Sequence, residues 1–277
     1  MASSRLAAHM LALVLLAGTQ LTAGAAPKAK TTANDFFIRS LHENETVAGR
    51  NLAIVHIDQA IAMDGNNAMY WRQKGAILSS MDEHEQALPC FEKSLKIDPN
   101  DCLTWNSYSN TLSNLKRYPE ALAAVDKGIK MDPGGACRIT KSAILAMMRR
   151  FPEAEKELDI AIKTNPENLL ARSRRPDVSF YLGHWDKVIA DTTILIPRTH
   201  DGAKLAELYR ERGEAYAGKT LYDKAVSDYK TGLKLHPDMR QLHESLRKVY
   251  KLKGDTAGVR AETAELAAID EDLRPGK

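Results

Sequence analysis

The sequence contains few aromatic residues and few cysteines, and neither sign of charge dominates. Phe, Trp and Tyr make up 6% of the 277 residues, there are three cysteines, and the formal net charge is +3. So balanced a charge argues against nucleic acid as a partner. The cysteines lack the CxxC spacing of a zinc or redox motif.

The motifs that usually carry chemistry are also missing. The sequence has no Gly-rich phosphate loop, no Gly-x-Ser-x-Gly turn and no His-Glu-x-x-His helix. The acidic residues are scattered beside Lys and Arg, as on ordinary solvated helix faces. We therefore expect no enzymatic activity, no metal and no cofactor.

Long hydrophobic runs are absent except near the N-terminus. Arg5 precedes a short apolar run from Met10 to Ala17, and small residues follow at Ala23–Ala25. This order is typical of a cleaved signal peptide, here residues 1–26. The alternative is a membrane anchor, but the run is short for about 30 Å of hydrocarbon. We expect an exported protein, periplasmic or secreted, without stable membrane insertion after cleavage.

The odd number of cysteines leaves at least one unpaired in an exported protein. Cys102 and Cys137 lie near the starts of the first helices of neighbouring units described below, so a disulfide between them is conceivable. In the alternative interpretation, Cys90, Cys102 and Cys137 are all small buried apolar residues. The sequence leaves both interpretations open.

What the sequence does contain is a repeat. An aromatic residue followed three positions later by a small one recurs at intervals of 33, 34 and 37 residues, in Tyr118–Ala121, Phe151–Ala154, Trp185–Val188 and Tyr222–Ala225. Prolines 99, 133, 166 and 237 each lie 12 residues after an alanine. A period of this length indicates a solenoid of identical structural units.

Each unit is predicted to be a helical hairpin. In residues 68–100, Trp71, Gly75 and Leu78 have helical spacing, and a second helical pattern runs from Ala87 to Leu95. The small residues at 75 and 87 would let the two helices approach closely. Pro99 ends the second helix, because proline lacks the amide hydrogen and clashes with the preceding turn.

This pattern resembles the tetratricopeptide repeat family. The family has Trp, Leu-Gly and Tyr in the first helix, followed by Ala, Phe, Ala and Pro in the second. The matching residues are Trp71, Gly75, Leu78, Ala87, Phe91, Ser94 and Pro99 in one unit; Trp105, Ser109, Leu112, Ala121, Val125, Gly128 and Pro133 in the next; and Tyr209, Gly213, Tyr216, Ala225, Tyr229, Gly232 and Pro237 in the last clear one. The resemblance implies an all-α, right-handed superhelical solenoid with a C-terminal capping helix.

The period sets the expected boundaries. A linker spans 27–33 and a flexible tail spans 271–277. Between them the solenoid covers 34–270, with repeats at about 34–67, 68–101, 102–134, 135–168, 169–202 and 206–239 and a cap at 240–270. The first unit has Gly65 in place of the proline. The fifth has Pro176 in its first helix and Val188 in place of alanine, so we expect a distorted unit and a bend there.

In the tetratricopeptide repeat family, which this sequence resembles, the first helix of each repeat lines a concave groove. The corresponding positions are Met69, Arg72, Ala76, Leu103, Asn106, Asn110, Ile139, Ala143, Met147, Ser173, Asp177, Phe180, Glu207 and Arg210. Asn106 and Asn110 are one helical turn apart, so their amides could hydrogen-bond the backbone of an extended peptide. The alternative is a pair of solvated asparagines.

Six arginines gather in the fourth and fifth units: Arg138, Arg149, Arg150, Arg172, Arg174 and Arg175. Guanidinium groups bind carboxylates in a bidentate manner, so an acidic partner segment could dock here, although a solvated face is the alternative. Some family members grip a peptide's terminal carboxylate, but Ala76, Thr140 and Leu170 interrupt that residue set. The candidate partner-binding residues are Arg72, Asn106, Asn110, Arg172, Arg174 and Phe180.

The sequence thus predicts a protein that binds other proteins. The leading hypothesis is an exported, non-enzymatic scaffold that holds a peptide or protein segment in its concave groove. The alternative is a structural subunit of a cell-envelope or secretion assembly.

Overall fold

The computed structural model describes residues 31–272 except 45 and 47. This part of the chain contains fourteen α-helices, one short 3₁₀ helix and no strand, so the predicted all-α class is confirmed. The predicted signal peptide, most of the linker and residues 273–277 of the tail lie outside the described residues. No helix in the described part is long and apolar enough to cross a membrane.

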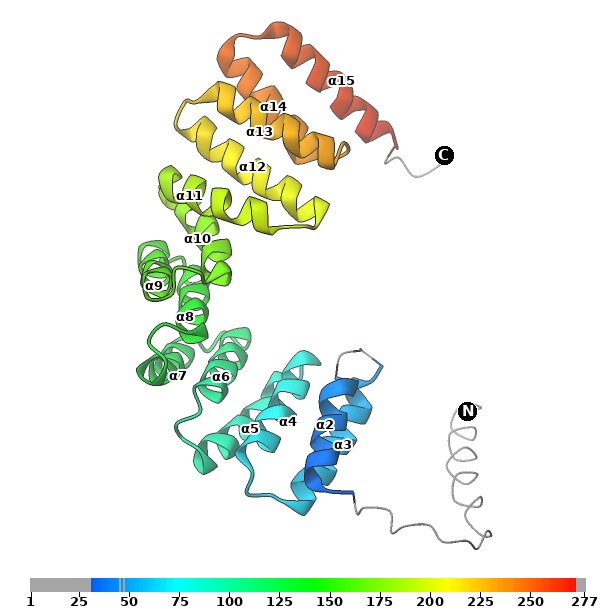
Figure 1. The fold of residues 1–277 in the computed structure, drawn as a ribbon, viewed down its shortest axis with the longest axis vertical. Helices are drawn as coiled ribbons and strands as arrows, with labels where there is room; N and C mark the ends of the chain where they lie inside the picture. Colours follow the sequence, from blue (N-terminus) through cyan, green and yellow to red (C-terminus); the bar gives the residue numbers. More distant parts are fainter. Residues whose placement is uncertain (1–30, 45, 47, 273–277) are drawn as a thin grey trace, which may run out of the picture.

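The helices pair in chain order into hairpins stacked along an arc (Figure 1). The pairs are α2 (Ala33–Glu43) with α3 (Arg50–Met63), α4 (Ala68–Ser80) with α5 (His84–Ile97), α6 (Cys102–Asn114) with α7 (Tyr118–Met131), α8 (Ala136–Met147) with α9 (Phe151–Thr164), α10 (Leu169–Leu182) with α11 (Trp185–Leu195), α12 (Gly202–Gly218) with α13 (Tyr222–Leu235), and α14 (Arg240–Lys253) with α15 (Thr256–Asp272).

The C-terminal region corrects one prediction. Instead of a single capping helix, residues 240–272 form two helices, α14 and α15, which pack together as a seventh hairpin. Gly254 joins them in a left-handed conformation with φ of 74°. A glycine at this position ends α14, because it adopts positive φ without a steric penalty.

The same turn geometry recurs in the other hairpins from α4 onward. One residue in each turn has positive φ, and the amide of the next residue donates to a carbonyl five residues earlier, for example Glu83 N to Leu78 O at 3.0 Å. This bond satisfies carbonyls that the helix end leaves free. The left-handed residues are Asp82, Lys116, Arg149, Gly183, Thr220 and Gly254.

The prolines act as predicted in the regular units, where α5, α7, α9 and α13 each end two residues before one. The fifth unit is irregular, as expected, but the irregularity is not at Pro176. Helix α10 continues through Pro176, while α11 is shorter and ends in a 3₁₀ turn, Ile196–Arg198. The irregularity therefore falls in the second helix of the unit, next to Pro197.

Small residues bring the helices of a hairpin together. A Cβ atom on Gly75 would lie 2.8 Å from the Phe91 ring, and one on Gly213 would lie 2.5 Å from the Tyr229 ring. Between neighbouring hairpins, a Cβ on Gly128 would lie 2.4 Å from Cys137 Sγ. The three cysteines are free thiols, with Cys90 and Cys137 buried.

A second regular contact holds each hairpin to the one before it. In the second to sixth units, the seventh residue of the repeat contacts a residue on the second helix of the preceding unit. The pairs are Lys74–Asp58 at 2.7 Å, Tyr108–Glu92 at 3.1 Å, Lys141–Asp126 at 2.8 Å, Arg175–Asp159 at 2.7 Å and Arg212–Thr193 at 3.3 Å.

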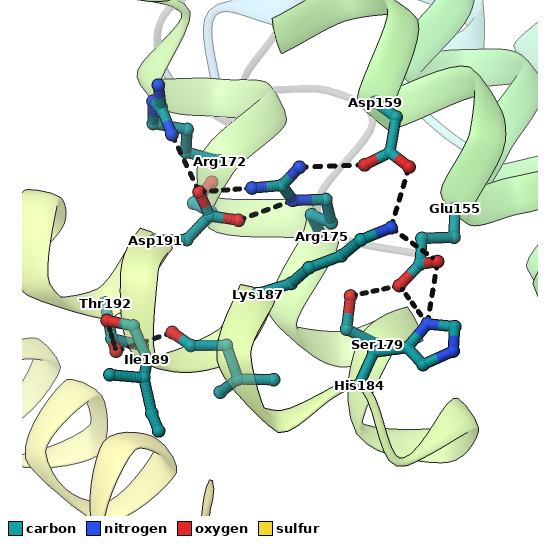
Figure 2. A network of polar contacts seen from close by, with 12 residues as sticks. Glu155, Asp159, Arg172, Arg175, Ser179, His184, Lys187, Ile189, Asp191 and Thr192 are labelled. Carbon is teal, nitrogen blue, oxygen red and sulfur yellow. Dashed lines mark hydrogen bonds and ion pairs between the residues drawn. The ribbon is translucent and has the colours of Figure 1, made fainter.

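The fourth and fifth units are joined by the densest polar network. Arg175 donates to both oxygens of Asp191, at 2.7 and 2.9 Å, and to Asp159 at 2.7 Å (Figure 2). Arg172 adds a bond of 2.9 Å to Asp191, whose side chain is fully buried. A buried carboxylate requires such partners, because burial without them is costly.

The network continues across α9 to the turn before α11. Lys187 Nζ lies 2.7 Å from Asp159 and 2.8 Å from the buried Glu155 (Figure 2). Ser179 donates to Glu155 at 2.6 Å, and His184 Nδ1 lies 2.9 Å from it. Helices α9, α10 and α11 are therefore fixed to one another by charge as well as by packing.

Replacement of Gly213 by alanine tests the close helix approach. Gly→Ala in a helix normally stabilises by up to about 1 kcal/mol, but here the new methyl meets the buried Tyr229 ring. We expect a net loss of about 1–2 kcal/mol in the free energy of unfolding, measured by urea titration. Gly202→Ala, with open space around its Cβ, is the control and should lose nothing. Equal stability of the two variants would contradict the packing described here.

Replacement of Arg175 by methionine tests the network. It removes three hydrogen bonds and leaves Asp191 with Arg172 alone, so we expect a loss of roughly 3 kcal/mol in unfolding free energy. The matched control is Arg150→Met, because the Arg150–Glu153 pair at 2.7 Å is exposed. An exposed pair contributes less than about 1 kcal/mol. Similar losses of unfolding free energy in the two variants would show that burial does not determine how much an ion pair stabilises the fold.

Candidate functional site

The first helices of the third, fourth and fifth units line a concave groove of about 580 Å³. Six of the predicted groove positions and the candidate residue Arg174 lie on it together, since Cβ atoms spaced by three or four residues share one helix face. They are Asn106 and Asn110 from α6, Ile139, Ala143 and Met147 from α8, and Arg174 and Asp177 from α10. Thr140, Leu170 and Val178 complete the wall.

Three polar side chains in this groove are available to a ligand. Asn106 Oδ1 is buried and has no hydrogen-bond partner. Asn110 and Arg174 are exposed, and neither makes a side-chain hydrogen bond or an ion pair to another described residue. A buried polar atom without a partner is unusual in a folded protein. A peptide N–H would satisfy it.

The groove continues between α10 and α12. Here a hollow of about 420 Å³ is lined by Pro176, Phe180, Tyr181 and Val188 on one side and by Arg210, Glu211 and Glu214 on the other. Asp177 lies on both hollows and so connects them. Phe180, 38% exposed, packs edge-on against Trp185 with ring centroids 5.0 Å apart.

Carboxylates dominate this second part of the groove. Burial, together with the nearby negative charges of Asp177 and Glu207, raises the pKa of Glu211 to about 7 from 4.5. Arg210 is held by Glu207 and by Glu214 at 2.5 Å, so its charge is already neutralised. Burial also raises the pKa of Asp177.

Arg72 is less available than the sequence suggests. Its Nη1 lies 2.6 Å from Asp101 Oδ2, and both side chains are partly buried. Asp101 also caps α6, because it accepts from Leu103 N at 3.0 Å. The contact joins the second unit to the third, which is a structural role.

Arg172, a candidate partner-binding residue, has partners within the chain. Its Nε donates to Pro166 O at 2.9 Å, and its Nη1 donates to Asp191. Trp71 and Trp105, at the same repeat position, donate their indole N–H to Gly65 O and Pro99 O at 2.9 and 2.8 Å. Arg172 thus replaces the indole donor that closes each unit onto the preceding turn.

Most of the other arginines of the predicted cluster also have structural roles. Arg138 takes the tryptophan position and donates to Pro133 O and to Glu157 at 2.5 Å. Arg175 belongs to the buried network, and Arg150 pairs with Glu153. Arg149 occupies the left-handed turn. Of the six, Arg174 is the one that lines the groove.

Sequence reasoning missed two kinds of residue. Glu211 and Glu214 were not predicted as groove residues, although they flank Arg210 on the same stretch of α12. The structural role of Arg138 and Arg172 did have a signal, because they follow Trp105 at 33 and 67 residues, the period of the repeat. Among the described residues, no group of three or more His, Cys, Asp or Glu side chains could hold a metal ion.

Comparison with known proteins supports the repeat assignment. Two family models, both described as tetratricopeptide repeat, match residues 68–101 and 90–123. No curated protein sequence matches the chain significantly.

Solved structures share the fold at low sequence identity. The C-terminal part of a TPR repeat-containing protein from Cytophaga hutchinsonii aligns with a TM-score of 0.68 and 11% identity, covering 86% of this chain and 96% of that one. PilW, a type IV pilus biogenesis factor, aligns at 0.64 and 18%, covering 77% and 98%. YrrB, a TPR protein with an unusual peptide-binding site, aligns at 0.55 and 20%, covering 68% and 96%.

The hairpin order, the close helix approach at Gly75 and Gly213 and the two matched repeats agree with one another. The chain is a tetratricopeptide repeat protein.

Proposed function

We propose that this protein is an exported, non-enzymatic scaffold that binds an extended peptide or protein segment in its concave groove. The observation that carries the proposal is the groove between α6, α8 and α10, where Asn106 Oδ1 is buried without a partner beside Asn110 and Arg174. Amide side chains offer both donor and acceptor, which suits the backbone of an extended chain.

The walls of the groove suit such a ligand. Met147 and Leu170 expose 57% and 52% of their surface, so apolar side chains are presented beside the amides. Apolar contact supplies affinity, while a few placed polar groups fix the orientation of the ligand. The fold itself presents a long surface rather than an enclosed reaction site.

The charge of the groove bears on the kind of segment. The sequence suggested an acidic partner, but within the groove Arg174 is the unpaired cation, and Asp177 and Glu211 are the carboxylates without an ion pair among the described residues. These charges favour recognition through the backbone and apolar side chains over recognition of an acidic segment at this place.

Export rests on the N-terminal sequence. Arg5, the apolar run Met10–Ala17 and the small residues at 23–25 are ordered as in a signal peptide. Cleavage after residue 26 would leave the hairpins as the mature protein in the periplasm or outside the cell.

The alternative function is a structural subunit of a cell-envelope or secretion assembly, and one observation favours it. Leu52 and Val55 on the convex side of α3 are 49% and 50% exposed. The equivalent positions of α5 and α7 carry Gln86, Pro89, Glu120 and Ala123. An exposed apolar stripe is typical of a contact with another subunit. PilW, a fold relative, is a pilus biogenesis factor.

Replacement of Asn106 and Asn110 by alanine tests the groove. With a partner recovered by pull-down from envelope or medium, we expect binding weakened by about 5- to 150-fold, since each of the two lost hydrogen bonds contributes about 0.5–1.5 kcal/mol. Salt dependence, followed by calorimetry at two ionic strengths, should not change because the contacts are neutral. Arg174→Gln should reduce the salt dependence of binding, because it removes a charge that salt screens.

The control for the asparagine variant is Asn100→Ala, at an exposed turn outside the groove. It should bind like the parent, and all variants should keep the parent's melting temperature. Unchanged affinity in the Asn106 and Asn110 variant would move the binding site off the groove and favour the assembly subunit.

Glu211 should make stability depend on pH. The folded pKa of Glu211, about 7, is above the unfolded value of 4.5. The contribution of the protonated side chain to the free energy of unfolding is therefore complete below pH 4.5 and is lost as pH rises through 7. Glu211→Gln mimics the protonated side chain. The variant should equal the parent near pH 4.5 and exceed its unfolding free energy by up to about 3 kcal/mol at pH 8. Exposed Glu85→Gln is the control, and a pH-independent difference would refute the assignment.

A further inference from the structure

A further cavity lies outside the groove. It has a volume of about 880 Å³ and lies in the C-terminal hairpin between α14 and α15. It shares no residue with the two hollows that meet at Asp177. We call it the C-terminal crevice. Its lining residues are Glu244, Arg247, Lys248, Lys251, Gly254, Asp255, Thr256, Val259, Arg260 and Thr263.

The basic side chains of α14 fall into two groups. Arg240 pairs with Glu244 at 2.8 Å and also with Asp270, and Lys253 pairs with Asp223. By contrast, Arg247, Lys248 and Lys251 are exposed and make no side-chain hydrogen bond or ion pair to another described residue. These three unpaired cations are the ones that line the crevice.

The carboxylates of the crevice do not neutralise these cations. Glu244 is held by Arg240, and Asp255 accepts from Gly258 N at 2.9 Å at the start of α15. Arg260, from α15, adds a fourth cation, with its Nε directed to Thr256 O at 3.3 Å. With four cations and two carboxylates, the lining of the crevice carries an excess of positive charge.

The crevice is also apolar at its base. Val259 packs against the core cluster of the last two hairpins. The methyl groups of Thr256 and Thr263 and the methylene stems of the lysines extend this surface, since long basic side chains cover apolar area while their charges stay in water. A ligand that fits must combine anionic groups with an apolar group.

We propose that the C-terminal crevice is a second docking site, separate from the concave groove, that binds an acidic polypeptide segment carrying an apolar side chain. The apolar side chain enters between α14 and α15, and flanking carboxylates pair with Lys248, Lys251 and the neighbouring arginines. The crevice is formed within one helical hairpin, which suits a short segment of a single chain. A flat membrane surface or a nucleic acid duplex would instead need a broad basic face, and the chain's net charge of +3 offers little for either.

The test uses a short fluorescein-labelled peptide of glutamate, serine and leucine, and the same peptide with glutamine in place of glutamate. Anisotropy titrations at low and high salt follow binding to the full chain. We expect the glutamate peptide to bind and the glutamine peptide to bind at least tenfold more weakly. Lys248→Gln with Lys251→Gln should weaken the glutamate peptide roughly three- to tenfold and flatten its salt dependence.

The matched control is Lys93→Gln with Lys96→Gln, two exposed lysines also three residues apart on the convex face of α5. It should bind like the parent, and so should Asn106→Ala with Asn110→Ala, which separates this site from the groove. Equal binding of both peptides, equal loss in both lysine variants, or preference for duplex DNA or phosphatidylserine vesicles would overturn the proposal.

Discussion

The close approach of the two helices in a hairpin is the constraint on which the rest of the structure depends. At Gly75 and Gly213 the absence of a side chain lets an aromatic ring of the second helix lie directly on the backbone of the first. Ala87, Ala121, Ala154 and Ala225 are fully buried at the partner position. Because each hairpin is fixed in this way, its first helix presents the same face in every unit, and these faces form the concave wall.

Stacking then depends on polar contacts that recur with the repeat. A donor at the fourth position of the repeat bonds to a carbonyl of the preceding turn, and it is Trp71, Trp105, Arg138, Arg172 or His243. The residue at the seventh position reaches the preceding second helix. Guanidinium and indole are chemically different, yet both supply a long N–H donor, so the unit keeps its geometry when the residue type changes.

The arrangement of unpaired charge separates two surfaces. In the fourth and fifth units, four of the six clustered arginines, Arg138, Arg150, Arg172 and Arg175, are paired within the chain, so the cluster does not make a continuous basic surface. In the C-terminal hairpin, Arg247, Lys248 and Lys251 remain unpaired. Burial and pairing, rather than the number of basic residues, decide where a charged partner finds an attractive field.

The sequence by itself determined the repeat, the helical hairpins and the helix ends before Pro99, Pro133, Pro166 and Pro237. These follow from local rules: helical periodicity fixes a face, and a proline just beyond a helix prevents its extension. The second C-terminal helix escaped prediction because no repeat consensus covers residues 240–272, although Gly254 marks the turn.

Only the tertiary structure decided which polar groups are free. Arg172 and Arg174 are two residues apart and chemically identical, yet one is held by Pro166 and Asp191 and the other lines the groove. The raised pKa of Glu211 likewise depends on Asp177, which lies on another helix. Electrostatic environment is set by neighbours distant in sequence and by burial, and a single sequence does not contain the distances on which both depend.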